Sequence, residues 1–269
     1  MTRTALAVLR EEKHLSISAI NTYRRCPSQH EHRYLLRTPL SHRSGALAFG
    51  GAIHIALAFF YGRLMEQQPE PTTEELQQVF ADAWRQELDG STPVLLDKND
   101  TPESLLDKGI GLMQVFHEQA ERPTRVVGVE EAFSIELCDM ETGEVLESRL
   151  VGVLDAVVED QPGVFRILEH KTAGRRYSET TLTHDLQVTA YSLAAPMLGL
   201  GDAKVSLQVL LKQKNPALEV YHLTRTRRDH QDLLHTVAGV HRAIEAGAFF
   251  PVRDWWCCGC PFAGPCLAG

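Results

Sequence analysis

One stretch of the chain constrains its fold more than any other: residues 149–171, which read RLVGVLDAVVEDQPGVFRILEHK. Two runs rich in valine and leucine, 150–159 and 164–170, lie on either side of Gln161-Pro162-Gly163. Proline presets φ at a turn and glycine accepts a positive φ, so these three residues favour a tight reversal. The pattern predicts a β-hairpin at the centre of the chain.

The register of this hairpin decides which polar side chains meet. With Asp160 facing Val164 across the loop, Asp155 lies directly opposite Glu169, and Lys171 joins them because side chains alternate along a strand. A slip of one residue would put the two carboxylates on different faces. Two carboxylates on an otherwise apolar face repel each other and lose solvation, so they need a cation or a strong partner. A divalent metal with Lys171 beside it meets that need, and an ordinary ion-pair cluster is the alternative.

Composition sets the broad class. The chain has 269 residues, of which 43% are hydrophobic and 23% charged, as in an ordinary soluble protein with a real core. No apolar run is long enough to predict a membrane span, and charge enters the N-terminus too soon for a secretory signal. We therefore expect a cytoplasmic protein without membrane partners. The formal net charge of −8 does not suggest a nucleic-acid binder, but a local basic patch and a metal can do that work.

The N-terminal part is expected to be helical. Ser16 and Ser18 offer N-caps for a helix through about residue 36, with a break at Cys26-Pro27 because proline costs a helix interior about 3 kcal/mol. A cysteine at such a break is either a metal ligand or a buried thiol. A second helix, from Gly45 to about residue 66, carries His54 at the border of its apolar stripe. That histidine is either a packed core residue or a metal ligand.

Periodicity and turn residues place the remaining elements. In chain order they are helices 73–88 and 102–119, strand 126–137 with a turn at 139–143, helix 180–198, strands 204–212 and 218–223, and helix 227–246. Gln187 and Tyr191 stand four residues apart and share a helix face. Glu130 and Glu131 adjoin the sheet, either at a solvated edge or in support of the site. The helices 73–88 and 102–119 read as an insertion without chemistry of its own.

The C-terminal tail is the second strong signal. It reads WWCCGCPFAGPC and holds four of the six cysteines. Disulfides are disfavoured in a reducing cytosol and neighbours this close pair poorly, so metal ligation by thiolates is the better explanation. Cys257-x2-Cys260 is a common pair of ligands, Cys266 adds a third, and Cys26 is the candidate for the fourth because Cys258 would point away. Zinc and iron accept the same four sulfurs, so residue type alone does not choose between them.

Both signals belong to one ordered set of landmarks. These are Ser16-Ile17-Ser18 through Tyr23, Cys26-Pro27, Gly51, His54, Gly152, Asp155, Glu169-His170-Lys171-Thr172, Gln187, Tyr191, Cys257, Cys260 and Cys266. The set resembles the PD-(D/E)XK nucleases of the RecB-like branch. It is most similar to CRISPR-associated iron–sulfur exonucleases and to the nuclease domains of helicase–nuclease subunits. Each landmark alone is weak, but together they span nearly the whole chain in the family's order and are highly specific.

The resemblance implies roles for these residues. A divalent metal, Mg²⁺ or Mn²⁺, would be held by His54, Asp155, Glu169 and the backbone carbonyl of His170. The catalytic set would comprise Asp155, Glu169, Lys171, Gln187 and Tyr191. Lys171 would orient or help deprotonate the attacking water, and Gln187 and Tyr191 would contact the DNA strand or brace the site. A [4Fe-4S] cluster would be held by Cys26, Cys257, Cys260 and Cys266, and this resemblance is the reason to prefer iron to zinc.

We therefore expect an α/β restriction-endonuclease-like core, a mixed central sheet flanked by helices, with a helical insertion and an iron–sulfur cap joining the N- and C-termini. A single domain would divide into an N-terminal helix with the first cluster cysteine (15–44), a helical region with the metal-ligand histidine (45–122), the nuclease core (123–246) and the iron–sulfur tail (247–269). The expected activity is a metal-dependent DNA exonuclease that prefers single strands or free ends. It would act in DNA repair, recombination or CRISPR adaptation, with helicase or CRISPR-adaptation proteins as candidate partners. The rivals are a DNA-binding or scaffolding subunit with little activity, and a zinc-binding structural module.

Overall fold

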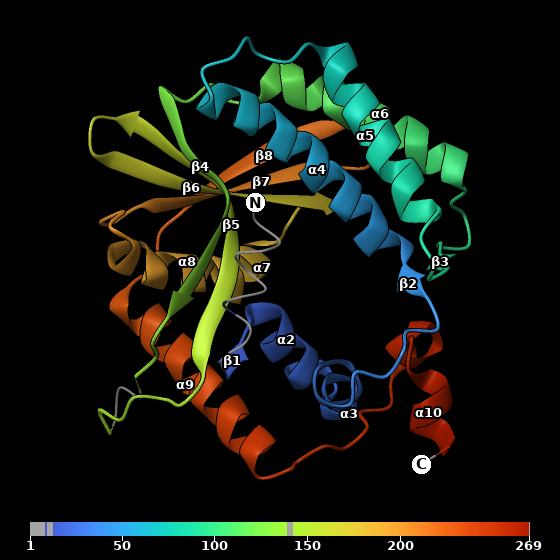
Figure 1. The fold of residues 1–269 in the computed structure, drawn as a ribbon, viewed down its shortest axis with the longest axis vertical. Coiled ribbons are helices and arrows are strands. Elements are labelled where there is room, and N and C mark those ends of the chain that lie inside the picture. The colour runs from blue at the N-terminus through green and yellow to red at the C-terminus, as the bar shows by residue number, and fades with distance from the viewer. Residues whose placement is uncertain (1–8, 10–12, 139–141, 269) are drawn as a thin grey trace. The chain divides into compact units, whose positions relative to one another are not determined.

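The computed structural model describes residue 9 and residues 13–138 and 142–268 (Figure 1). Contacts within the chain divide it into two compact units that interleave along the sequence. The first unit consists of residues 1–42, 132–152 and 225–269, and the second unit of residues 43–131 and 153–224. The subdivision of one domain into four consecutive segments stays a prediction.

A mixed sheet forms the centre of the second unit. Its strands are β5 (Arg149–Gln161), β6 (Val164–Ala173), β7 (Lys204–Leu211) and β8 (Ala217–Leu223), hydrogen-bonded in that order, and β4 (Arg125–Ile135) pairs with β5. Of β4 and β5, residues 125–131 and 153–161 belong to this unit, and the remaining parts belong to the first unit. The pairs β5–β6 and β7–β8 are antiparallel, whereas β6–β7 is parallel. The prediction of a mixed central sheet flanked by helices is confirmed.

The hairpin formed by β5 and β6 has the predicted register beyond its turn. Ala156 pairs with Leu168, and the same register continued by one residue places Asp155 across from Glu169. The side chain of Asp155 accepts a hydrogen bond of 2.7 Å from the main-chain nitrogen of His170, the neighbour of Glu169. Asp155 and Glu169 are therefore cross-strand neighbours, as the predicted register requires.

The turn of the hairpin differs from the expectation of a three-residue loop. Gln161 pairs with Val164, which leaves Pro162 and Gly163 as a two-residue loop, and Gly163 has a φ of +77°. The register shifts between Glu159 and Gln161, so a bulge takes up the extra residue. The side chain of Glu159 accepts a hydrogen bond from the nitrogen of Gly163 and holds this turn.

Three helices cover one face of the sheet in the second unit, as Figure 1 shows. They are α4 (Gly45–Met65), α5 (Thr73–Leu88) and α6 (Pro102–Gln119). Their buried side chains pack against the sheet residues Ala156, Val158, Leu168 and Leu210. Gly109 on α6 allows α5 to approach, because a Cβ there would lie 1.9 Å from the ring of Phe80. The predicted insertion is thus a layer of the core.

The predicted helix 180–198 is divided into three pieces. These are α7 (Glu179–Thr183), α8 (Leu186–Ala194) and the 3-10 turn η2 (Ala195–Leu198). The chain breaks at His184 and Asp185 because Asp185 adopts an extended conformation and caps α8 with its side chain. The prediction of one continuous helix is wrong, and the capping residue is the physical reason.

Helix α4 is long and apolar enough, by length and composition, to cross a membrane. The expectation that no segment would pass this test is therefore wrong. Half of its most apolar window is buried inside the protein, as in the core helix of a globular protein. The short strand β2 (Arg43–Ser44) directly precedes this helix and pairs in parallel with β3 (Val94–Leu95), which follows α5.

The first unit brings together segments from both ends of the chain. Its elements are β1 (His14–Leu15), α2 (Ile17–Arg25), α3 (Pro27–His30), the π-turn η1 (Glu31–Leu35), α9 (Arg227–Glu245), the 3-10 turn η3 (Trp255–Gly259) and α10 (Ala263–Ala268). As predicted, Ser16 caps the first helix and the helix breaks at Pro27. The hydroxyl of Tyr23 donates to the carbonyl of Ala248, and the nitrogen of Ser28 to the carbonyl of Phe250. The predicted turn at 139–143 lies mostly outside the described residues.

Candidate active site and cysteine pocket

The predicted nuclease residues all belong to the second unit. Strand β5 carries Asp155, β6 carries Glu169, His170 and Lys171, α4 carries His54, and α8 carries Gln187 and Tyr191. The structure brings them together in two groups of side-chain contacts, His54 with Asp155 and Glu169 with Lys171, Gln187 and Tyr191, and Asp155 bonds the main-chain nitrogen between Glu169 and Lys171.

Asp155 and His54 form the first part of this network. The two side chains meet at 3.2 Å between Oδ1 of Asp155 and Nδ1 of His54. Burial by itself would raise the pKa of Asp155, but the hydrogen bond and charge of His54 and the N–H of His170 outweigh it and lower the pKa to about 2. Burial would lower the pKa of His54, but Asp155 raises it to about 9. Without a metal, the two side chains form an ion pair of a protonated imidazole and an ionised carboxylate.

Glu169 and Lys171 form the second part. Glu169 is only 1% exposed, and its Oε1 accepts from the Lys171 ammonium, while Oε2 has no hydrogen-bond partner among the described residues. Burial and the charge of Asp155 raise the pKa of Glu169 to about 8. The pKa of Lys171 is raised too, because the charge and hydrogen bond of Glu169 outweigh its burial. An unsatisfied oxygen in a buried carboxylate is the feature that a cation would remove.

Gln187 and Tyr191 extend the network from Lys171. The Lys171 Nζ donates to Oε1 of Gln187 at 2.7 Å, and Nε2 of Gln187 donates to the Tyr191 hydroxyl at 2.6 Å. The hydroxyl in turn donates to the carbonyl of Val153 at 2.6 Å. Both side chains therefore lie beside Lys171, and their part in catalysis stays a prediction.

The imidazole of His170 has a different environment from its main chain. Its ring stacks on Tyr61 with centroids 5.4 Å apart, on the side of α4, and burial lowers its pKa to about 4. The ring is thus part of the core, while the main-chain N–H of His170 donates to the side chain of Asp155. Metal ligation by its carbonyl stays a prediction.

Glu130, which the sequence left either at a solvated edge or in support of the site, lies beside His54 and Asp155. Within residues 13–138 and 142–268, one set of three histidine, cysteine or acidic ligand atoms lies within 4.8 Å of one another: His54, Glu130 and Asp155. Burial, with the charge of Asp155, raises the pKa of Glu130. Its φ of +53° is rare for a residue other than glycine and turns the side chain out of strand alternation.

The sequence holds only a weak signal for this position. Buried residues of β4 alternate at Val126 and Gly128, then at Phe133 and Ile135, so the parity changes around Glu130. Val127 and Val129 make the first half of the strand apolar on both faces and hide the change. Of the two readings of Glu130, its partial burial beside His54 and Asp155 favours support of the site over a solvated edge.

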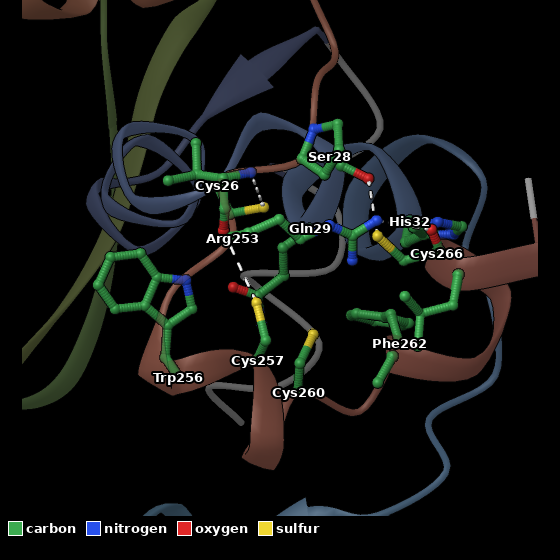
Figure 2. A pocket seen from close by; sticks show the side chains of 14 residues that line it. Cys26, Ser28, Gln29, His32, Arg253, Trp256, Cys257, Cys260, Phe262 and Cys266 are labelled. Atoms are coloured by element: carbon green, nitrogen blue, oxygen red, sulfur yellow. Dashed lines mark hydrogen bonds between the residues drawn. The ribbon is translucent and has the colours of Figure 1, made fainter.

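The four predicted cluster cysteines lie in the first unit and line one cavity of about 190 Å³ (Figure 2). Cys26 comes from the junction of α2 and α3, Cys257 and Cys260 from η3 and its end, and Cys266 from α10. Burial and the nearby charges of the other three raise the pKa of the Cys260 thiol. Cys258 is exposed and does not line the cavity; its sulfur donates to the carbonyl of Trp255 instead.

The sequence profile of the PD-(D/E)XK nuclease superfamily matches residues 14–267. No curated protein sequence matches significantly. Among solved structures, a "Putative exonuclease" from Eubacterium rectale has a TM-score of 0.59 at 14% identity, over 96% of this chain and 88% of that chain. The structure of SSO0001 has a TM-score of 0.39 at 14% identity, over 90% of this chain and 94% of that chain, which is too low to carry an argument.

These matches support different conclusions. At 14% identity the Eubacterium rectale structure shows a shared fold and no more. The profile spans nearly all of the chain, including the sheet, α4, α8 and the cysteine tail. The chain belongs to the PD-(D/E)XK nuclease superfamily.

Proposed function

We propose that this chain is a metal-dependent DNA exonuclease whose active site is the Asp155–Glu169–Lys171 network of the second unit. The observation that carries the proposal is the environment of Glu169. One of its oxygens contacts Lys171, and the other is buried without a hydrogen-bond partner among the described residues. Such an oxygen is costly to bury, and a hard divalent cation is the ligand that satisfies it.

The available donors fit Mg²⁺ or Mn²⁺. Asp155 and Glu169 supply hard carboxylate oxygens, and His54 supplies an imidazole nitrogen, which makes Mn²⁺ at least as suitable as Mg²⁺. Glu130 adds a carboxylate within 4.8 Å of the ligand atoms of His54 and Asp155. The carbonyl of His170 is the further proposed ligand.

The chain's own residues have distinct roles in this proposal. When bound, the cation polarises the phosphate and lowers the pKa of a water molecule. Lys171 stays protonated beside Glu169, so its ammonium can orient the attacking water and offset the charge that develops on the phosphate. Asp155 and Glu169 need to be ionised, which requires the proton on Glu169 to leave. The buried surroundings strengthen each of these interactions.

DNA ends or single strands are proposed as the substrate. The support is the resemblance of the ordered landmarks to CRISPR-associated exonucleases and helicase–nuclease subunits, with the name of the Eubacterium rectale structure pointing to an exonuclease. The same resemblance supports a pathway in DNA repair, recombination or CRISPR adaptation, with helicase or adaptation proteins as partners.

A [4Fe-4S] cluster in the first unit is the second part of the proposal. Cys26, Cys257, Cys260 and Cys266 line one cavity, and main-chain N–H groups of Val252 and Asp254 lie 3.5 Å from the sulfurs of Cys26 and Cys257. Main-chain donors of this kind stabilise cluster-bound thiolates.

The preference for a cluster over zinc rests on the resemblance to iron–sulfur exonucleases. Zinc accepts the same four thiolates, so the donor set alone does not choose between the two.

The test is a nuclease assay on end-labelled linear and circular DNA, single- and double-stranded, with Mn²⁺. The unmodified protein should shorten linear strands from an end and leave circles intact, and Ca²⁺ should permit binding without turnover. Lys171→Ala should abolish cleavage, whereas Lys98→Ala, at an exposed lysine of the same unit, should not. No cleavage by the unmodified, metal-loaded protein would support the scaffolding alternative and reject this proposal.

A further inference from the structure

Basic side chains are concentrated in two short segments of the second unit. The unit as a whole is acidic, with 23 aspartates and glutamates against 14 lysines and arginines. The segments 171–176 and 212–216 hold five of those 14 and contain no acidic residue. The five are Lys171, Arg175, Arg176, Lys212 and Lys214. Since the rest of the unit carries a large excess of negative charge, these two segments are where it attracts a polyanion.

The two segments lie side by side at the end of the sheet. Strands β6 and β7 are parallel, so both segments leave the sheet at the same edge. Two hydrogen bonds join them, from the main-chain nitrogen of Lys212 to the carbonyl of Ala173 at 2.8 Å and from Nε2 of Gln213 to the carbonyl of Gly174 at 3.4 Å. Arg175 and Lys214 follow directly after these bonded residues, and both are exposed. The segments therefore form one basic surface.

This basic surface begins in the candidate active site. Lys171 is bonded to Glu169, and the four residues from Lys171 to Arg175 span at most about 14 Å of extended chain. Burial raises the pKa of the nearby Tyr177, and the charge of Lys171 partly offsets that rise, as expected for neighbouring groups. Phosphates of one B-form strand follow one another about every 3.4 Å along the axis. A strand cleaved at Lys171 therefore has further phosphates within reach of the arginines.

Arg176 is held in one orientation by Glu219 on the edge strand β8. Its Nε lies 2.5 Å from Oε1 of Glu219, whose side chain is 15% exposed, whereas the side chain of Arg176 is 76% exposed. The second oxygen of Glu219 accepts from the hydroxyl of Tyr221, which is also hydrogen-bonded to the main chain of Tyr177. The guanidinium is thus fixed on the side of Nε, and its exposed terminal nitrogens keep donors for a ligand.

Phosphate is the ligand that this arrangement fits. An exposed ion pair contributes little to stability, so the fold gains little by holding Arg176 in place for its own sake. A guanidinium presents its N–H donors in a rigid fork that matches the oxygens of a phosphate. Arg175 adds a second charge next to it, and no ion pair among the described residues involves Arg175.

We propose that Arg175 and Arg176 bind backbone phosphates of the DNA strand that occupies the active site, and that Glu219 orients Arg176 for this contact. This inference rests on DNA as the substrate of the proposed function. Contacts to phosphates carry no sequence information, so the basic surface would position any DNA strand at Lys171.

The test measures the Kd for single-stranded DNA with Ca²⁺ at several salt concentrations, and kcat with Mn²⁺ at saturating DNA. Arg175→Ala and Arg176→Ala should each raise the Kd about fivefold and reduce the slope of log Kd against log salt by about 0.7, the value for one phosphate contact. The loss of kcat should be smaller than the rise in Kd. Arg85→Ala removes an exposed, ion-paired arginine of α5 and is the matched control, which should change neither quantity.

Glu219→Gln tests the orientation of Arg176 separately. By charge alone, the loss of a carboxylate from this surface would strengthen DNA binding. If Glu219 orients Arg176, the Kd should instead rise about threefold, and the same change should have no further effect in the Arg176→Ala background. A lower Kd in Glu219→Gln would overturn the orienting role.

An unchanged Kd and salt slope in both arginine variants would overturn the inference. A loss of kcat without a change in Kd would do the same, because the segment would then only support catalysis. Far-UV spectra and Tm show whether Arg176→Ala keeps its fold. Arg175→Ala breaks no ion pair of the described residues and decides the question if Arg176→Ala does not fold.

Failure of the inference is distinct from failure of the proposed function. If the unmodified protein binds DNA through these arginines but does not cleave it, the nuclease proposal fails and the phosphate contact stands. If it cleaves DNA and both arginine variants bind as tightly as the unmodified protein, only the phosphate contact fails. If it does not bind DNA at all, both are rejected.

Discussion

At the scale of single residues, two groups of the proposed metal site, His54 and Glu169, carry protons that a bound metal would displace. Below pH 9 His54 is charged, because Asp155 raises its pKa to about 9, and below pH 8 Glu169 is protonated, because its pKa is raised to about 8. A metal binds a neutral imidazole and an ionised carboxylate. Occupation of the site at pH 7 therefore requires both groups to lose a proton.

Mn²⁺ binding should accordingly release close to two protons at pH 7, and its affinity should increase with pH up to about 9. Calorimetric titrations in two buffers of different ionisation enthalpy measure this number directly. His54→Ala should reduce it by about one. A binding enthalpy that is independent of the buffer would show that these two groups are not the ligands.

Glu130→Gln tests the ligand that the sequence did not single out. The change removes a charge but keeps the shape, so Mn²⁺ affinity should fall roughly tenfold, within the range for losing a supporting group at a metal site. Glu131→Gln is the matched control, since Glu131 is the exposed neighbour on the same strand. Equal losses in the two variants would reduce the effect to general electrostatics around the site.

Sequence reasoning was strongest where one geometric rule connects residues. Strand pairing alone brought Asp155 and Glu169 together, because a two-residue period and one register decide the face. Glu130 escaped because its position depends on a positive φ, which no pattern of side chains encodes. Contacts between elements distant in sequence, such as His54 with Asp155, entered only through family resemblance.

At the scale of helices and strands, capping residues decided which boundaries could be predicted. The bounds of α5 and α6 follow from Thr72 and Thr101, each of which forms a reciprocal capping box in the structure. The helix expected over 180–198 breaks at Asp185, although the apolar pattern continues through this position. The side chain of Asp185 accepts hydrogen bonds from two main-chain nitrogens and so caps a new helix there. The sequence could not distinguish the two-residue loop Pro162-Gly163 with its bulge from the predicted three-residue loop, because both give nearly the same pattern of side chains along the strands.

Asp185→Ala should therefore affect both stability and catalysis. It leaves the main-chain nitrogens of Gln187 and Val188 without their acceptor, which costs about 1 kcal/mol of unfolding free energy for a lost N-cap. It also loosens the turn that holds Gln187, so kcat should fall. Urea denaturation and the Mn²⁺-dependent nuclease rate measure the two effects.

Ser178→Ala is the control for this change. Ser178 caps α7 in the same way, by accepting from the nitrogen of Thr181, but α7 carries none of the site residues. It should lower stability without a comparable loss of kcat. If both variants slow cleavage equally, the effect of Asp185 is only one of stability.

At the scale of the whole molecule, cysteines from both ends of the chain line one cavity in the first unit. Cys26 lies near the start of the sequence and the other three near its end, so the proposed shared cofactor would close a loop nearly as long as the chain. Closing a loop of that length restricts the unfolded chain, and metal-binding free energy then becomes folding free energy. The core of the second unit, by contrast, consists of α4–α6 and the sheet without any of these cysteines.

Cys266→Ser should therefore remove iron and sulfide and destabilise the first unit selectively. Hydrogen exchange followed by mass spectrometry should show lost protection in α2 and α9, while α4, α5 and α6 keep theirs, because their buried aromatic side chains do not depend on the cofactor. Cys258→Ser, which changes an exposed neighbour outside the cavity, should leave both iron content and exchange unchanged. Loss of iron in Cys258→Ser with retention in Cys266→Ser would reverse the assignment of the ligands. An anaerobic preparation that contains zinc and no sulfide would replace the cluster with a zinc site.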